Sequence, residues 1–467
     1  MKAGSGYRRE PRTPCQRVGD QRHSPSRGAE SGVGAVTEVA KDLQDVGSET
    51  DGPSLWRQRD FMLLWSGQTV SEMGSAVTQI ALPLVAVVAL KASTFEVGLL
   101  TAATTAAFAV IALPAGALVD RGSKRSIMII CNILRLLIIG SVPVVAALGN
   151  LTMTQLYIVA VTAGVCTVFF DVSYQSYVPS LIRADLRMDA NGKLGTTQAF
   201  AQLGGPSLGG GLVAAFGAAG AMTADAISYA ISVFSISGIR TREEPPPARR
   251  EGETLRSQIA EGLRFVVGHK ILRRVVACTG TANLFSGMSS ALAMVFLVRV
   301  LHVRPGLIGL VVAGSAVGGI AGGVFAGRLA RRIGSARIIW VSMLVFSAPQ
   351  VIAAAAWRGW GVLLFPLGWG IAYFSGMVYN VAQLSYRQSV TPPELMGRMN
   401  AAVRWIVWGT LPVGGILGGA LGTLIGVRPT LWLAFIGSWA AGWFVFFSPL
   451  RHMRDVPGPA PAPGVTR

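Results

Sequence analysis

Three ionisable residues, Glu72, Arg135 and Asp225, stand inside long apolar stretches of this sequence. A charge buried in an apolar segment is costly, so such residues are expected to have a function. At 1.5 Å per residue, Glu72 lies about 16 Å and Arg135 about 13 Å into their stretches from the same side. A carboxylate at that depth is suited to carrying a proton. The alternatives are a permanent ion pair between Glu72 and Arg135, and a simple hydrogen bond between Asp225 and a neighbouring helix.

Uncharged polar side chains supply a second set of candidates. Gln68, Glu72 and Gln79 recur at a spacing that places them close to one face of a helix, so they are predicted to line a cavity. The later part of the chain has its own polar residues within apolar stretches, and these are candidates to face a bound small molecule: Asn283, Tyr373, Asn380 and Gln383. Most such groups bridge neighbouring helices instead, and the sequence does not rank them.

The elements that must position these residues are apolar stretches long enough to cross a bilayer. Hydrocarbon about 30 Å thick needs roughly 20 helical residues per crossing. Hydrophobic residues make up 51% of the 467-residue chain and charged residues only 14%, a balance that a soluble protein would not have. We therefore predict an all-α polytopic membrane protein with twelve transmembrane helices. Their expected ranges are 61–89, 95–119, 126–148, 154–180, 195–217, 219–239, 275–298, 306–330, 336–356, 361–386, 400–424 and 428–449.

Lysine and arginine are distributed unevenly between the two sides of these stretches. The chain has 41 Lys and Arg against 23 Asp and Glu, a formal charge of +18. If the N-terminal tail is placed inside, the outer side holds only Lys91, Arg299, Arg304, Arg358 and Arg428. Because positively charged loops remain cytoplasmic, we predict a multi-pass protein of the cell membrane with both termini in the cytoplasm. The basic loops are expected to contact anionic lipid headgroups, and nucleic-acid binding is not expected.

The second group of six stretches repeats the first. Aligning 171–191 with 380–400 matches Tyr177 with Tyr386 and Asn191 with Asn400, and Gly217 then falls on Gly426. Such a repeat indicates two parallel six-helix halves. The predicted organisation is a disordered cytoplasmic tail (1–60), a first half (61–239), a linker (240–274), a second half (275–450) and a C-terminal tail (451–467). A predicted helix in the linker lies either in the headgroup plane or against the cytoplasmic face of the bundle.

A charged motif follows the second stretch: Gly116-Ala-Leu118-Val-Asp120-Arg121-Gly-Ser123-Lys124-Arg125. It resembles the signature between the second and third helices of the major facilitator superfamily, except that Ser123 stands where the family prefers Gly. The resemblance implies a latch that locks the two halves together in one conformation and releases them in the other. The residues of this expected latch are Gly116, Asp120, Arg121, Lys124, Arg125, Asp171 and Arg404, with Arg404 as a partner for Asp120. A simpler interpretation is that the basic residues only set the topology.

The corresponding motif of the second half has lost its acidic positions. Arg331 stands where the first copy has Asp120, and Asn380 corresponds to Asp171. We therefore expect the first half to carry the working latch, and the second half to keep mainly its basic anchors.

A glycine-rich element comprises Gly205, Pro206, Gly209 and Gly210 and is similar to one in fifth helices of the drug/proton antiporter branch. Small residues permit tight helix crossing and Pro206 bends the helix, so a pure packing role is the alternative. Two further stretches, beginning at Trp65 and Glu261, look like the enterobactin-exporter and macrolide-efflux branch. The resemblance covers about residues 56–450.

The resemblance implies a secondary active transporter in which one half moves against the other around a central site. The expected version exports a hydrophobic or amphipathic small molecule, such as an antibiotic, a siderophore or another secondary metabolite, in exchange for protons, and works as a monomer. The alternatives are an importer or uniporter of a small polar nutrient and a transport-inactive receptor or scaffold. The sequence has no Gly-x4-Gly-Lys-Ser/Thr loop and no HExxH spacing. We therefore expect no ATP drive, no metal, no cofactor and no enzymatic activity.

Overall fold

The computed structural model describes residues 55–119, 122–182, 186–241, 255–392 and 395–456. These residues form helices joined by short turns, with no β-strand among them. Ten of the described helices are long and apolar enough to cross a membrane. This confirms the predicted class, an all-α polytopic membrane protein. The predicted latch residues Asp120 and Arg121, and most of both predicted tails, lie outside the described residues.

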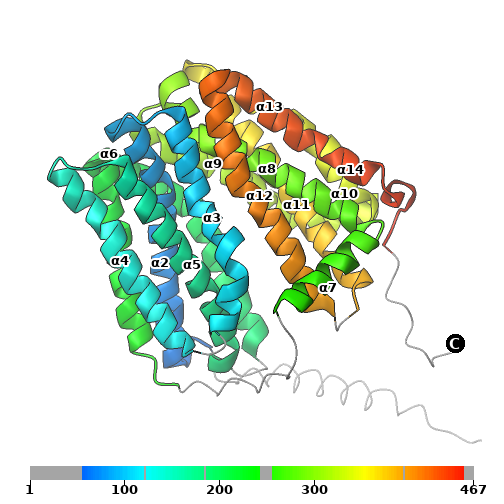
Figure 1. Ribbon diagram of the computed structural model, residues 1–467, viewed down its shortest axis with the longest axis horizontal. Coiled ribbons are helices and arrows are strands. Elements are labelled where there is room, and N and C mark those ends of the chain that lie inside the picture. The colour runs from blue at the N-terminus through cyan, green and yellow to red at the C-terminus, as the bar shows by residue number, and fades with distance from the viewer. Residues whose placement is uncertain (1–54, 120–121, 183–185, 242–254, 393–394, 457–467) are drawn as a thin grey trace, which may run out of the picture. The chain divides into compact units, whose positions relative to one another are not determined.

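The helices of the first half follow the predicted stretches closely (Figure 1). They are α2 (Arg59–Leu84), α3 (Thr94–Val119), α4 (Lys124–Ala147), α5 (Met153–Leu181) and α6 (Arg187–Ser237). The single helix α6 covers two predicted crossings, because its two arms join at Gly217 without a loop. Gly217 has φ 73° and ψ 168°, a conformation that glycine adopts without the steric cost of a Cβ. The predicted break between residues 217 and 219 therefore lies at this kink.

The second half contains α8 (Leu272–Val295), α9 (Pro305–Ile333), α10 (Arg337–Val341), α11 (Leu364–Val390), α12 (Met396–Leu424), α13 (Val427–Ala440) and α14 (Gly442–Phe446). The predicted crossing at 336–356 is the least regular. It begins as α10, continues as a π-helical turn over Ser342–Phe346 and ends as a 3-10 helix over Ala348–Ala353. With this stretch and the two arms of α6 counted separately, each of the twelve predicted crossings corresponds to a helical segment.

Equivalent backbone features recur in the two halves at the ends of their first helices. Helix α2 continues into a π-helical turn over Val85–Ala89, and α8 into one over Phe296–Val300. Each turn leads to a residue with positive φ, Lys91 at 50° and His302 at 57°. The aligned glycines Gly217 and Gly426 also both have positive φ, 73° and 94°. The sequence repeat therefore has a counterpart in local geometry, including at positions where the residue types differ.

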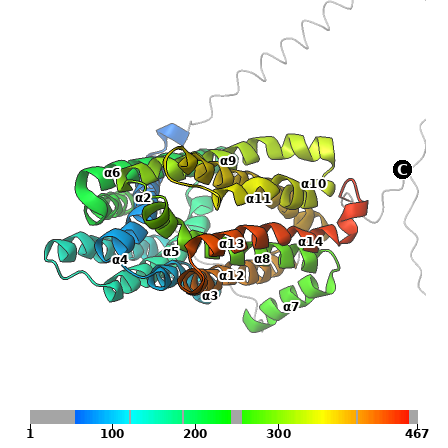
Figure 2. The ribbon, with the colours of Figure 1, turned by 90° about the horizontal axis from the view of Figure 1, so that it is seen from above.

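The two halves contact each other along two lines, α3 against α12 and α6 against α9, which lie on opposite edges of the bundle (Figure 2). We call the end of the bundle where α2, α4, α6, α8 and α12 begin the linker end. The tightest contacts lie near the other end. A Cβ on Gly98 would come within 2.6 Å of Gly419 Cα, and a Cβ on Gly210 within 2.8 Å of Gly309 Cα. Glycine thus lets the two backbones touch where the halves meet.

The linker contributes helix α7 (Leu255–Gly268), which packs against the beginning of α12. Glu261 forms an ion pair with Arg398, and a Cβ on Gly262 would lie 2.3 Å from the carbonyl oxygen of Arg398. The helix therefore packs on the bundle, which is one of its two predicted placements.

Candidate functional site

A cavity of about 1060 Å³ lies between the two halves. Helices α2, α3, α4, α5 and α6 line it from one side, and α8, α9, α11 and α12 line it from the other. Its lining reaches Pro179 and Leu194, near the linker ends of α5 and α6. At the opposite end the glycine contacts between the halves close it. The cavity is therefore directed toward the linker end.

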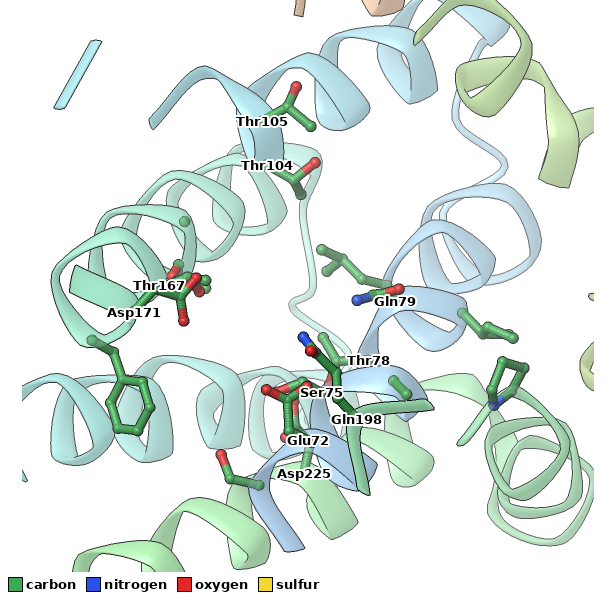
Figure 3. Close-up of a pocket in the computed structure, with 18 of the residues that line it drawn as sticks. Glu72, Ser75, Thr78, Gln79, Thr104, Thr105, Thr167, Asp171, Gln198 and Asp225 are labelled. Atoms are coloured by element: carbon green, nitrogen blue, oxygen red, sulfur yellow. The ribbon is translucent and has the colours of Figure 1, made fainter. Parts of the chain in front are cut away.

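The wall formed by the first half carries ionisable groups. Glu72, Arg135, Asp171 and Asp225 all line the cavity, so the structure brings these four predicted residues together from four helices. Figure 3 shows Glu72, Asp171 and Asp225 among the side chains that line this cavity. Gln68 and Gln79 line the cavity as predicted, and Gln68 Nε2 donates a hydrogen bond to Glu72 Oε1 at 2.8 Å.

Arg135 is the cation at the centre of this wall. Its guanidinium lies over the rings of Phe170 and Tyr229, 5.0 and 5.3 Å from their centroids, and its Nη1 donates to Asn132 Oδ1 at 3.3 Å. It has no ion pair within 4.0 Å with Glu72 in the described structure, so the predicted alternative of a permanent Glu72–Arg135 pair is not present. Its charge interacts at longer range with Glu72, Asp171 and Asp225. One cation thus faces three carboxylates.

Asp225, on the second arm of α6, is completely buried. Ser228 Oγ, one turn along the same helix, donates to its Oδ1 at 3.2 Å, and the hydroxyls of Thr78 and Tyr229 lie beside the same carboxylate. Gly74 of α2 packs against this group, because a Cβ there would lie 2.6 Å from Asp225 Oδ1. Hydroxyl groups therefore surround this buried carboxylate, as expected for a polar group in an apolar helix.

The wall formed by the second half is aromatic and uncharged. Phe365, Trp369 and Tyr373 of α11 and Trp408 of α12 line the cavity, and no described Asp, Glu, Lys or Arg of this half does. The rings of Phe365 and Trp369 lie 4.7 Å apart, and Phe108 of α3 approaches Trp408 to 5.0 Å across the two halves. Of these residues, the sequence had singled out only Tyr373, because an aromatic side chain in an apolar helix looks like any other packing residue.

The other polar candidates of the second half do not line the cavity. Asn283 donates to the carbonyl of Val407 at 3.0 Å and joins α8 to α12. Gln383 donates to Asn380 Oδ1 at 3.0 Å within α11. Gln383 also accepts from Arg387, which donates to Asn400 and thereby joins α11 to α12. The sequence placed Arg387 in a loop, but α11 continues to Val390 and buries it.

The sequence also missed a polar stripe on α3. Thr101, Thr104 and Thr105 line the cavity, and each hydroxyl donates to a carbonyl one turn back in the same helix. Threonines spaced three and four residues apart in an otherwise apolar helix were a signal that could have identified this face.

The described part of the expected latch lies at the linker end. Lys124 and Arg125 begin α4, and Arg125 donates from Nε to the carbonyl of Ile236 at 3.1 Å and from Nη2 to that of Ser237. These bonds join α4 to the end of α6 within the first half. A Cβ on Gly116 would meet no atom within 4 Å, so the packing does not require glycine there.

Arg404 lies on the third turn of α12, and its predicted partner Asp120 lies outside the described residues. A smaller pocket of about 120 Å³ between α3, α5 and α12 is lined by Arg404 and Asp171, together with Phe108, Trp405 and Trp408. Trp405 Nε1 donates to the carbonyl of Ala109 at 2.9 Å and joins the halves beside it. Among the described residues, Asp171 is the carboxylate that shares this pocket with Arg404.

The glycine-rich element of α6 has two faces. Gly205 and Gly209 pack on α2, since their Cβ atoms would lie 2.3 Å from Ala76 Cβ and 3.2 Å from Val77 Cα. Gly210 and Pro206 instead face α9, where a Cβ on Gly309 would lie 2.1 Å from the carbonyl oxygen of Pro206. One face holds the first half together, and the other forms the contact between the halves.

Two equivalent groups of membrane-length helices around a central cavity define this protein as a polytopic membrane transporter. The chain belongs to the transmembrane secretion effector family of the major facilitator superfamily, whose profile matches residues 52–460. It is 25% identical over 386 residues to the multidrug efflux pump Tap of Mycolicibacterium fortuitum, covering 79% of this chain and 90% of that one. The Tap protein of Mycobacterium tuberculosis is 24% identical over 383 residues, covering 79% and 88%.

Solved structures share the fold. A bacterial homologue of the iron transporter ferroportin in an inward-facing state matches with a TM-score of 0.69 at 15% identity, covering 83% of this chain and 98% of that one. A bacterial homologue of the lysosomal transporter Spinster, inward-facing and unoccupied, matches with a TM-score of 0.63 at 16% identity, covering 85% and 97%.

Proposed function

We propose that this protein is a proton-coupled exporter of hydrophobic or amphipathic small molecules. The observation that carries the proposal is Glu72, a carboxylate deep within a membrane helix that lines a large cavity between the two halves. The names of the Tap relatives, multidrug efflux pumps, support the direction of transport. The aromatic wall of the second half supports an apolar cargo, because a site for a polar nutrient would need more hydrogen-bonding groups on both walls.

The proposed orientation places the linker end in the cytoplasm. Its basic residues include Arg125, Arg264 and Arg398, and positive charge is retained on the cytoplasmic side, where anionic headgroups also attract it. In this orientation both termini are cytoplasmic, and the cavity faces the compartment from which an exporter of the cell membrane collects its substrate. The proposed working unit is a monomer, since each chain contains both walls.

The proposed cycle begins with substrate entry from the linker end. The halves then separate along α6–α9 and α3–α12 at the opposite end while closing at the linker end. Substrate leaves outward, and a proton that binds Glu72 from outside is released inward after the return. The predicted latch, from Gly116 to Arg125 with Asp171 and Arg404, would hold the linker end closed during the outward-facing part of this cycle.

The test is dye accumulation in bacteria that lack their major efflux pumps and express the full chain, with and without an uncoupler of the proton gradient. We expect lower accumulation with the wild-type protein, restored by the uncoupler and by Glu72→Gln. Glu261→Gln is the matched control, because it makes the same side-chain change in an ion pair outside the cavity. Uphill export that persists in Glu72→Gln would place the coupling site elsewhere.

A further inference from the structure

A second hollow lies on the second half, away from the central cavity. It has a volume of about 720 Å³ and is lined by α9, by α11 with the 3-10 turn that precedes it, and by the irregular crossing at 336–356. Its lining consists only of Val, Leu, Ile, Phe, Pro and Gly, and it shares no residue with the lining of the central cavity. We call this hollow the α9–α11 groove.

Glycine and an interrupted helix accompany the groove. Helices α9 and α11 lie side by side (Figure 2), and a Cβ on Gly318 would lie 1.9 Å from the carbonyl oxygen of Gly370. Both glycines line the groove, so this part of its wall has no side chains. On the third wall, Val345 belongs to a π-helical turn and Pro349 to a 3-10 helix. The equivalent helix of the first half, α4, continues without a break over Lys124–Ala147.

The groove opens to the lipid and has the depth of one leaflet. Val317 and Val345 line it and remain 59% and 55% exposed, although both lie in apolar membrane segments. The lining residue Phe374 lies ten residues after the start of α11 at Leu364, which is about 15 Å at 1.5 Å per residue. Half of the hydrocarbon layer is also about 15 Å. The groove therefore extends from the end opposite the linker end to about the middle of the membrane.

Positive charge surrounds the groove at that end. Arg304 directly precedes α9, and Arg358 directly precedes the 3-10 turn Gly359–Leu363, whose last residue lines the groove. Both arginines are exposed. The connections of the second half at this end, 296–305, 354–363 and 425–430, contain four arginines and no Asp or Glu. This end of the groove is therefore suited to an anion.

Arg358 has hydrogen-bond donors available for such an anion. Its Nε donates to the carbonyl of Val300 at 3.3 Å, and its Nη2 lies 3.3 Å from Nε2 of His302. These two contacts leave other N–H groups of the guanidinium for a ligand, and a guanidinium binds phosphate oxygens well. Trp360, two residues further along, is 88% exposed, as is typical of an aromatic ring at the level of the lipid headgroups.

We propose that the α9–α11 groove binds an anionic phospholipid of the leaflet opposite the linker end. One acyl chain lies in the groove against Val317 and Val345, and the phosphate lies on Arg358 with Arg304 nearby. The chain matches the apolar lining and the depth of one leaflet, and the phosphate matches the positive charge at the end of the groove. The groove is separate from the central cavity, so this site does not depend on the proposed transport function.

The test is photolabelling of the purified full chain in nanodiscs of dioleoylphosphatidylcholine. A trace of phosphatidylglycerol with a diazirine in one acyl chain, or of phosphatidylcholine with the same chain, is activated by light, and labelled peptides are mapped by mass spectrometry. We expect the label to concentrate on peptides that line the groove and to be several-fold stronger with phosphatidylglycerol. Equal labelling by the two lipids, or even labelling of the whole lipid-facing surface, would overturn the inference.

Matched variants test the two parts of the site. Arg358→Gln is expected to lower groove labelling by phosphatidylglycerol about fivefold, the effect of one arginine at the headgroups. Arg328→Gln, also exposed but at the linker end of α9, is the control. Val345→Trp should fill the groove and remove the labelling, whereas Val324→Trp, 59% exposed on α9 outside the groove, should not. Groove labelling that survives both Arg358→Gln and Val345→Trp would overturn the inference.

Competition identifies the source of the phosphate. An excess of unlabelled dioleoylphosphatidylglycerol is expected to remove the groove labelling, whereas glycerol phosphate at the same concentration is not. Displacement by glycerol phosphate would mean that the arginines bind a soluble phosphate, and this result would overturn the assignment to a lipid.

Discussion

At equivalent positions of the repeat, the first half carries Phe170 and Asp171 and the second carries Tyr379 and Asn380. Asp171 lines the cavity and shares a pocket with Arg404. Asn380 instead accepts a hydrogen bond from Gln383 in a helix-bridging network that includes Arg387. The first helices of the two halves have kept the same backbone plan, including their terminal π-helical turns, while the ionisable groups of the halves have taken different tasks. We infer that the duplicated fold supplies two rigid halves, and that placing the charges on one half separates proton chemistry from substrate packing.

The largest effect is expected where the two halves touch. Gly210→Val would place side-chain atoms within the contact with Gly309, where a Cβ already comes to 2.8 Å of Cα. Overpacking of this kind costs about 1–3 kcal/mol, so the closed contact should be strongly disfavoured and export should fall at least tenfold. The measurement is the dye export rate at equal membrane abundance. Gly211→Val is the control, because a Cβ there meets no atom within 4 Å. An equal loss of export in both variants would contradict the proposed role of the contact between α6 and α9.

The next effect tests the division of charge directly. Asp171→Asn should slow export roughly tenfold, since it removes a charge interaction of about 1.4 kcal/mol that couples the halves. The reverse change in the second half, Asn380→Asp, should bring no gain, because this position does not line the cavity. Export rates of both variants check this prediction. Faster export by Asn380→Asp, or normal export by Asp171→Asn, would contradict the proposed functional asymmetry between the halves.

The third prediction, with a smaller expected effect, compares the buried arginines of the two halves, Arg135 and Arg387. Arg387 bonds to Gln383 and Asn400, so Arg387→Met should lower stability by about 1–3 kcal/mol through unpaired polar groups. It should leave the dye export rate unchanged at equal membrane abundance. Arg135→Met should instead lower the export rate and alter its pH dependence, because Arg135 lines the cavity. Thermal unfolding in detergent and the dye export rate measure the two outcomes. Slower export by Arg387→Met at normal stability would mean that the second half also contributes a charge to the site.

The smallest effect concerns two turns, one in each half, whose backbone N–H groups donate hydrogen bonds to an aspartate side chain. Asp60 accepts from the backbone N–H groups of Arg240 and Thr241 at 3.1 and 2.9 Å, and Asp455 accepts from that of Ser335 at 2.9 Å. The hydrogen bond from Ser335 holds the pKa of Asp455 below its ordinary value of 3.8. The contribution of Asp455 is therefore present above pH 3.8 and is lost as the pH falls through the lowered pKa.

Asp455→Asn should accordingly raise hydrogen exchange at 334–337 a few-fold at neutral pH. Hydrogen-exchange mass spectrometry checks this, with Asp189→Asn, in an ion pair of the first half, as the control. Protection that is unchanged at pH 7 in Asp455→Asn would show that other contacts hold the turn.

Much of the site could be predicted from the sequence, and the limits follow from what a linear pattern contains. Glu72, Arg135 and Asp225 were found because a charge within an apolar stretch is rare and costly. Trp369 and Trp408 were missed, because apolar helices contain aromatic residues for packing as often as for binding. Asn283 and Gln383 were candidates to face a ligand, with bonds to neighbouring helices as the alternative, and only the packed structure distinguishes the two.

The sequence by itself determined the number, boundaries and duplication of the membrane helices, because hydrocarbon thickness and helical rise leave little freedom once the apolar stretches are known. It also determined most of the side chains that carry charge within those stretches, but not Arg387, which it placed beyond the end of its helix. Only the tertiary structure decided which of them meet. It separated Gly205 from Gly210 on different faces of one helix, placed Arg404 and Asp171 in one small pocket, and gathered the charged residues of the cavity on its first-half wall. These outcomes depend on helix rotation and on contacts between distant segments, which no local pattern of residues specifies.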